Sequence, residues 1–286
     1  MTNPRIKIFC RSFDLRLYRL SKGLYESWGF PCVRLTDQTA DGYFRTMLKD
    51  TDCDIAINVD EDCFITNKQV VLNLVDYVIA NGIANAGCPD GGLDMPRRFN
   101  PLVTNPFFNV LNLNLLREQY SLEAEKNFEY NTHKQQMIDA YPKQMLVVGR
   151  LFDFDVVDQE PYYPFFLWQA YHTKTLYLPC ERHVDGCTTI VYNHEGEEMC
   201  RHTWFARFYS VPSWIVRTFQ SYHAGKQKQR INNIIRESYQ MAGVALPVFT
   251  FRDECAFRWN KIVRWVIKVP QRIIGWPKKL RKKLNR

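Results

Sequence analysis

Three consecutive acidic residues, Asp60, Glu61 and Asp62, directly follow the apolar segment DIAINV and carry the clearest chemical signal in the sequence. In an extended segment, residues two apart face the same side, so the carboxylates of Asp60 and Asp62 are expected to project together. Neighbouring carboxylates repel each other unless a cation or a donor lies between them. A hard divalent cation, Mn²⁺ or Mg²⁺, would relieve this repulsion and could also hold the diphosphate of a nucleotide sugar.

Two other interpretations of acidic pairs compete with this one. The triplet can be a solvated turn with no ligand. Asp153 and Asp155 in LFDFDVV have the same spacing, but Phe152 and Phe154 alternate with them, which favours an amphipathic strand over a metal site. A zinc site at Cys180, His183 and Cys187 lacks a fourth ligand.

The elements that must position the triplet alternate between strand and helix over the first hundred residues. Apolar patterns predict strands over 5–10, 31–37, 54–59 and 83–88, and helices over 14–29, 42–50 and 67–82. Asp14 is expected to cap the first helix, and Gly29 to end it. This alternation predicts an α/β fold with a mostly parallel, Rossmann-type sheet flanked by helices, in which ligands bind beyond the carboxyl ends of the strands.

This layout, with the third strand ending in D-x-D, resembles the GT-A class of glycosyltransferases over roughly residues 5–210. The resemblance implies that Asp62 ligates Mn²⁺ or Mg²⁺ and that Asp60 approaches the ribose, or the metal through water. The middle position varies in that class, so Glu61 is tolerated. A late histidine often supplies a third metal ligand, which His202 in CRHTWF would provide, with His194 as its competitor.

The same resemblance implies further site residues. Inverting members need an acid that removes the proton of the acceptor hydroxyl, and Glu160 or Asp158 would serve, with Glu160 slightly favoured. Phe9 and Arg11, at the end of the first strand, occupy the position where such an enzyme meets the nucleotide base. Arg45 could reach the same place.

An aromatic run follows the two candidate bases. Aromatic faces bind the apolar faces of sugars, so this run could line an acceptor groove. Most of its rings are nevertheless expected in the core, with Trp168 as the one that reaches the cleft. The run comprises Tyr162, Tyr163, Phe165, Phe166, Trp168 and Tyr171.

The net charge of +8 comes from the last thirty residues. Residues 257–286 hold eleven Lys or Arg and no acid, with Trp and Ile at helical spacing before Pro270. Such a segment suits the headgroup region of an anionic membrane. A helix packed on the catalytic domain with a basic end is the alternative. No nucleic-acid-binding motif accompanies the charge, so nucleic acid is not expected as a partner.

The sequence therefore predicts a GT-A-like catalytic domain over 1–210 and a helical region over 211–286 that contains the tail. No signal peptide, transmembrane run or cysteine framework is apparent, which favours a cytoplasmic protein peripherally bound to the inner leaflet. We expect metal-dependent transfer of a sugar from a nucleoside-diphosphate sugar to a membrane-linked glycan or lipid-linked acceptor. The alternatives are a nucleotidyltransferase acting on a sugar phosphate and a non-enzymatic membrane-binding adaptor.

Overall fold

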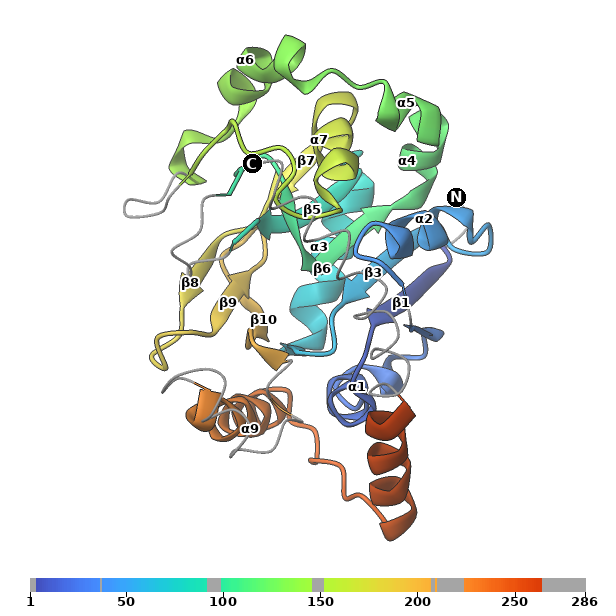
Figure 1. The fold of residues 1–286 in the computed structure, drawn as a ribbon, viewed down its shortest axis with the longest axis vertical. Coiled ribbons are helices and arrows are strands. Elements are labelled where there is room, and N and C mark those ends of the chain that lie inside the picture. Colours follow the sequence, from blue (N-terminus) through green and yellow to red (C-terminus); the bar gives the residue numbers. More distant parts are fainter. Residues whose placement is uncertain are drawn as a thin grey trace, which may run out of the picture.

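A six-stranded, mostly parallel sheet flanked by helices forms the centre of the computed structural model, which describes residues 4–36, 38–91, 99–145, 152–206, 209 and 224–263 (Figure 1). The strand order is β2-β1-β3-β6-β5-β7, and β6 alone runs antiparallel to its neighbours. The expected α/β class is thereby confirmed. The strands are β1 (Ile6–Arg11), β2 (Cys32–Leu35), β3 (Ile55–Val59), β5 (Asn85–Pro89), β6 (Thr104–Asn112) and β7 (Thr175–Tyr177).

A second, antiparallel sheet has the order β4-β10-β9-β8. Its strands are β4 (Cys63–Ile65), β8 (Cys180–Arg182), β9 (Thr189–Tyr192) and β10 (Glu198–His202). Only residues 60–62 separate β3 in the first sheet from β4 in the second. These three residues, named the acidic turn below, therefore join the two sheets.

Helices cover both faces of the central sheet because successive side chains of its buried strands point to opposite faces. In β3, Ile55 and Ile57 belong to one hydrophobic cluster, which includes α1 (Leu15–Lys22) and α3 (Lys68–Ala80). Ala56, between them, belongs to the other cluster. That cluster includes α2 (Gly42–Lys49), α4 (Leu113–Gln119), α6 (Tyr130–Ala140) and α7 (Tyr163–His172); the short α5 (Leu122–Lys126) lies between α4 and α6 in the chain.

Two sequence-based expectations for local structure are corrected. The first helix keeps its predicted cap, since Asp14 Oδ1 accepts hydrogen bonds from the backbone N–H of Arg16 at 2.9 Å and Leu17 at 3.1 Å. It ends at Lys22, however, and a 3₁₀ turn precedes Gly29, whose φ of +86° closes the segment. Asp153 and Asp155 lie in a turn and not in a strand: Asp153 Oδ1 accepts from Asp155 N at 3.0 Å.

The described part of the C-terminal region contains two helical segments, α9 (Ala224–Met241) and residues 251–263. Although α9 lies beyond the predicted domain boundary at residue 210, it shares a core with α1 and β4. Its core side chains are Ile231, Ile234, Ile235 and Tyr239. No helix among the described residues is long and apolar enough to span a membrane. Most of the predicted tail, 264–286, lies outside the described residues.

Candidate functional site

The acidic turn is a tight, buried turn and not the extended segment that the sequence suggested. Cys63 N donates to Asp60 O at 3.0 Å, which closes a reverse turn, because the chain must bend there to enter the second sheet. The three acids are only 7–8% exposed. A purely solvated turn is therefore excluded, and each carboxyl group needs a partner inside the protein or from a ligand.

Asp62 and His202 are brought together by strand pairing. β10 pairs with β4 so that His202 lies opposite Cys63, and Thr203 N donates to Asp62 O at 2.9 Å. His202 Nε2 consequently lies 3.3 Å from Asp62 Oδ1. Adjacent ligands of one octahedral Mg²⁺ lie about 3 Å apart, so this spacing suits either a direct ion pair or a shared cation.

The competing histidine, His194, has a different environment. Its ring stacks on Tyr77 with the ring centroids 3.8 Å apart, in the connection between β9 and β10. Of the two histidines that the sequence offered, His202 is the one placed beside the acidic turn.

Asp60 faces Arg11, the last residue of the neighbouring parallel strand β1. Arg11 Nη2 donates to Asp60 Oδ2 at 2.9 Å. The other carboxylate oxygen, Oδ1, is buried and has no hydrogen-bond partner among the described residues. His202 Nδ1 is also buried and has no hydrogen-bond partner among the described residues. Unpartnered buried polar atoms are costly, so Asp60 Oδ1 is an atom that an additional ligand could satisfy.

The two aspartates differ in their electrostatic balance. Burial is the largest influence on Asp60 and raises its pKa, although Arg11 acts in the opposite direction. Burial acts in the same way on Asp62, but the nearby His202 imidazole and Arg11 outweigh it, so the pKa of Asp62 is lowered. Asp62 is thus the better preserved anion of the pair, as a cation ligand must be.

Asp60 faces Arg11 and Asp62 faces His202, whereas Glu61 faces the loop between β1 and α1. It accepts hydrogen bonds from Ser12 Oγ at 2.9 Å and from the backbone N–H groups of Phe13 at 2.8 Å and Asp14 at 2.6 Å. Burial nevertheless raises the pKa of Glu61 to about 8. The middle acid therefore anchors the acidic turn to the loop between β1 and α1, a role that motif spacing did not reveal.

Aromatic rings and a polar network hold the segment that carries His202. Phe107 stacks on the imidazole with centroids 4.0 Å apart, and Trp204 packs against it at 4.3 Å. Trp204 and Phe205 have φ values of +55° and +57°, which non-glycine residues seldom adopt. Such a backbone persists only where surrounding contacts enforce it.

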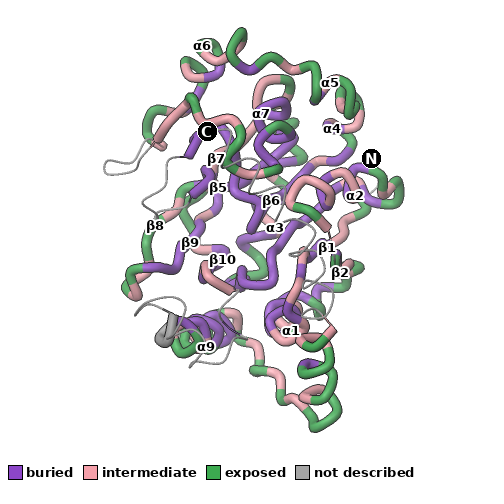
Figure 2. The backbone as a smooth tube through the Cα atoms, in the orientation of Figure 1, coloured by how far each residue is buried: buried purple, intermediate pink, exposed green. Residues whose placement is uncertain are grey.

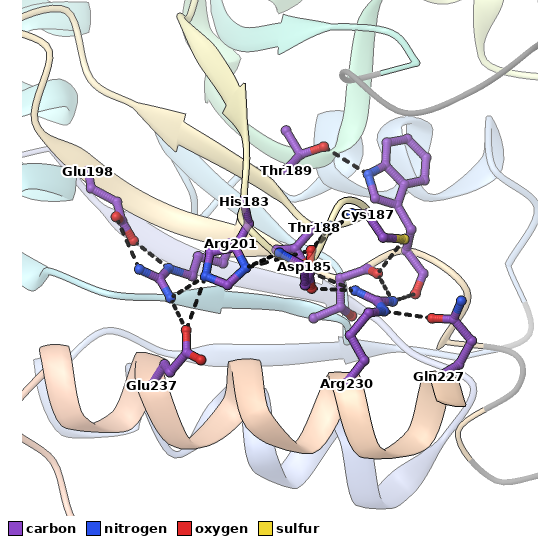
Figure 3. A network of polar contacts seen from close by, with 12 residues as sticks. His183, Asp185, Cys187, Thr188, Thr189, Glu198, Arg201, Gln227, Arg230 and Glu237 are labelled. Carbon is purple, nitrogen blue, oxygen red and sulfur yellow. Dashed lines mark hydrogen bonds and ion pairs between the residues drawn. The ribbon is translucent and has the colours of Figure 1, made fainter. Parts of the chain in front are cut away.

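Arg230 of α9 supplies those contacts, as Figure 3 shows. Its guanidinium donates to the carbonyl oxygens of Thr203 and Trp204, the latter at 3.2 Å. It is held in turn by Asp185 Oδ2 at 3.1 Å and Thr188 Oγ1 at 2.7 Å. Because Thr203 follows His202 directly, this network fixes the histidine beside Asp62.

A second set of contacts ties the same helix to β10. Arg201 Nη1 donates to Glu237 Oε2 at 2.6 Å, and His183 Nε2 lies 3.2 Å from the same oxygen (Figure 3). His183 is therefore engaged with α9. Among the described residues, no group of three or more His, Cys, Asp or Glu side chains is arranged to enclose a metal, which also removes support for a zinc site at Cys180 and Cys187.

Three residues assigned to ligand binding from sequence lie elsewhere. Phe9 is 1% exposed and belongs to the hydrophobic core, so it cannot stack on a nucleotide base. Arg45 pairs with Asp41 and Glu125, on α5, at 2.7 Å and 2.9 Å. Trp168, on α7, is fully buried, with its ring against those of Tyr120 at 5.1 Å and His172 at 4.9 Å.

The candidate bases lie just before α7. Asp158 is exposed, and Glu160, partly exposed, precedes the first turn of the helix. The carboxylate of Asp90, which follows β5, accepts hydrogen bonds from the hydroxyls of Tyr162 at 3.0 Å and Tyr163 at 2.6 Å. Asp90, which the sequence reasoning missed, thus anchors the start of α7 at the carboxyl end of the central sheet. The available signal in the sequence was an acid two residues after the predicted strand over 83–88.

The chain matches no protein-family model and no curated protein. Among the solved structures that are weakly similar to it are the following two. Protein A197 from STIV has a TM-score of 0.36 and 11% identity, over 68% of this chain and 93% of that one. A glycosyltransferase involved in glycosylation of the major capsid of PBCV-1 has a TM-score of 0.29 and 12% identity, over 58% of this chain and 90% of that one. These scores are too low to support conclusions about function.

Proposed function

We propose that the protein is a GT-A-like glycosyltransferase that transfers a sugar from a nucleoside-diphosphate sugar to a glycan or lipid-linked acceptor, with Mn²⁺ or Mg²⁺. The observation that carries this proposal is the placement of His202 Nε2 3.3 Å from Asp62 Oδ1, beside the unpartnered Oδ1 of Asp60. These atoms gather where β3 ends, and ligands of such sheets bind beyond the carboxyl ends of the parallel strands.

The donor set fits a divalent cation that is completed by substrate. Mg²⁺ is usually bound by one or two carboxylates, with substrate phosphates and water filling the other positions. Asp62 and His202 would hold it directly, and Asp60 would do so directly or through water. A bound cation would neutralise the diphosphate and stabilise its departure. Among the described residues, no three His, Cys, Asp or Glu side chains are arranged to enclose a metal, so substrate and water would have to complete the coordination.

Arg11 adds a fixed positive charge at the same place. Burial acts to lower its pKa, but Asp60, Tyr43 and Asp62 together outweigh burial and raise the pKa, so the guanidinium stays charged. A planar guanidinium matches phosphate oxygens well. On binding of a diphosphate, Arg11 would share its donors between Asp60 and the phosphate. It would thereby orient the donor and balance its charge.

The acceptor hydroxyl would lose its proton to Glu160. This side chain is only partly exposed and precedes a helix whose first turn Asp90 holds against the sheet edge, whereas Asp158 is exposed. Sugar transfer by the Glu160→Gln and Asp158→Asn variants distinguishes the two candidate bases: we expect loss of transfer in Glu160→Gln and not in Asp158→Asn.

Titration calorimetry with UDP and GDP, with and without Mn²⁺, tests the cation site. Asp62→Asn should weaken Mn²⁺-dependent nucleotide binding at least about tenfold and abolish sugar transfer, because a cation ligand becomes a neutral amide. Asp52→Asn is the matched control, since the Asp52 side chain is 84% exposed. Nucleotide binding by Asp62→Asn equal to that of the unaltered chain would refute the assignment.

A further inference from the structure

The helix over 251–263, named the docked helix below, has two faces of different character. One face packs on α1: Phe257 is 2% exposed and contacts Phe249, with their ring centroids 4.9 Å apart. The guanidinium of Arg16, on α1, lies over the Phe257 ring at 4.8 Å. Asn260 Oδ1 also accepts a hydrogen bond from Leu15 N at 3.1 Å. Figure 1 shows this helix beside α1, projecting from the body of the molecule.

Both acids of the docked helix belong to this buried side. Glu254 forms an ion pair with Arg16, and Asp253 lies 4.0 Å from Arg19. Their charges are therefore largely compensated by α1. Lys261, four residues after Phe257, lies on the same side and interacts electrostatically with Asp14. On the remaining surface of the helix, within the described residues, the charged side chains are Arg252 and Arg258.

The opposite side, named the outward face, is apolar as well as basic. Phe251, Cys255, Trp259 and Ile262 follow one another at helical spacing, and all four are exposed. Much of the docked helix is correspondingly green, the colour of exposed residues, in Figure 2. The exposed fractions are 85% for Phe251, 66% for Trp259 and 53% for Ile262. Val248, just before the helix, is 93% exposed. Contiguous exposed apolar side chains of this size mark an interaction site.

We propose that the outward face is a membrane-contact surface that rests on anionic lipid. Trp and Phe beside Arg suit the headgroup region, where rings enter the interface and basic groups meet lipid charge. The chain continues from this helix with nine more Lys or Arg and no acid over 264–286, so its charge complements an anionic surface.

The contacts with α1 give this surface a fixed relation to the acidic turn. Asn260 holds Leu15 N, and the three residues just before Leu15 donate the hydrogen bonds that Glu61 accepts. Lipid contact would therefore hold the acidic turn in a set orientation to the bilayer. An orientation of this kind suits the proposed transfer to a lipid-linked acceptor, and that last step rests on the proposed function. The lipid contact itself does not.

Vesicle flotation of the full chain tests the proposal without any nucleotide. The unaltered chain should float with vesicles of equal parts phosphatidylcholine and phosphatidylglycerol, and far less with phosphatidylcholine alone. A Trp259→Glu, Ile262→Glu double variant should lower the anionic partition coefficient at least about tenfold, because two anchors become acids. Val184→Glu is the control, since Val184 is 97% exposed on the β8–β9 connection.

The thermal midpoint of the double variant should equal that of the unaltered chain, since both altered side chains are exposed. If the double variant is folded and floats as well as the unaltered chain, the proposal is overturned. It is also overturned if the unaltered chain binds the neutral vesicles as strongly as the anionic ones. If the unaltered chain binds neither kind of vesicle, the proposal is overturned as well, and a protein becomes the expected partner of the outward face. None of these results bears on nucleotide binding, so failure here is distinguishable from failure of the proposed function.

Discussion

Glu61 lies between two candidate cation ligands, yet its own hydrogen bonds run to the loop before α1. The acidic turn thus combines two kinds of acid, with Asp60 and Asp62 facing a potential ligand and Glu61 fixing their backbone. The distinction follows from where the donors lie: the N–H groups of Phe13 and Asp14 point to Glu61, and satisfying them inside the protein requires an acceptor there.

Glu61→Ala should therefore destabilise the protein by about 2–3 kcal/mol, because it leaves buried donors without an acceptor. Glu61→Gln retains a carbonyl oxygen of the same shape and should cost less than about 1 kcal/mol. Urea unfolding of both variants measures the difference. A Glu61→Ala variant as stable as the unaltered chain would show that water replaces the carboxylate and that the anchoring role is wrong.

At the scale of elements, pairing of β4 with β10 brings His202 to the acidic turn, and α9 holds the end of β10 through Arg230. A helix that contributes nothing to the candidate site directly thereby determines its geometry. The backbone after His202 is strained at Trp204 and Phe205, so it depends on these contacts more than a relaxed loop would.

Arg230→Ala should lower stability by about 2–4 kcal/mol and weaken Mn²⁺-dependent nucleotide binding, since it frees the carbonyls of Thr203 and Trp204 and loosens His202. Arg236→Ala, an exposed position on the same helix, provides the control. Calorimetry together with urea unfolding distinguishes the two effects. Unchanged nucleotide affinity in a folded Arg230→Ala variant would contradict a positioning role for this arginine.

Asp185 gives the same region a pH dependence. Burial acts to raise its pKa, but hydrogen bonds from Thr188, Cys187 N and Arg230 outweigh it and lower the pKa to about 2. Because the folded-state value lies below the unfolded one, this stabilisation is complete above about pH 4 and is lost as the pH falls towards 2.

The pKa shift corresponds to about 2 kcal/mol. Unfolding measured between pH 5 and 2 should therefore show a steeper acid loss in the unaltered chain than in Asp185→Asn. Parallel curves for the two proteins would show that Asp185 is not the titrating group.

For the whole molecule, the hydrophobic core crosses the boundary that was predicted at residue 210. Four apolar side chains of α9 lie in one cluster with α1, α3 and β4. Burial of four such side chains contributes on the order of 6–12 kcal/mol, which is comparable to the net stability of a whole domain. The unit that folds by itself should therefore include α9.

A chain that ends at residue 210 should be unfolded or aggregate, whereas one that ends at Gly243 should retain a cooperative thermal transition. Circular dichroism and calorimetry of the two truncations provide the measurement. If the shorter chain folds with an unchanged midpoint, the predicted boundary at residue 210 describes an independent domain after all.

Local patterns in the sequence determined the α/β class, the strand that ends at the acidic turn, the Asp14 cap and the basic, apolar end of the chain. Apolar periodicity and capping act between residues a few positions apart, so they can be read without the fold. The pairing of Asp62 with His202, the burial of Phe9 and Trp168, the role of Glu61 and the docking of α9 were decided only by tertiary structure. These contacts join residues far apart in the chain, and sheet register and packing choose among many partners that the sequence alone leaves equivalent.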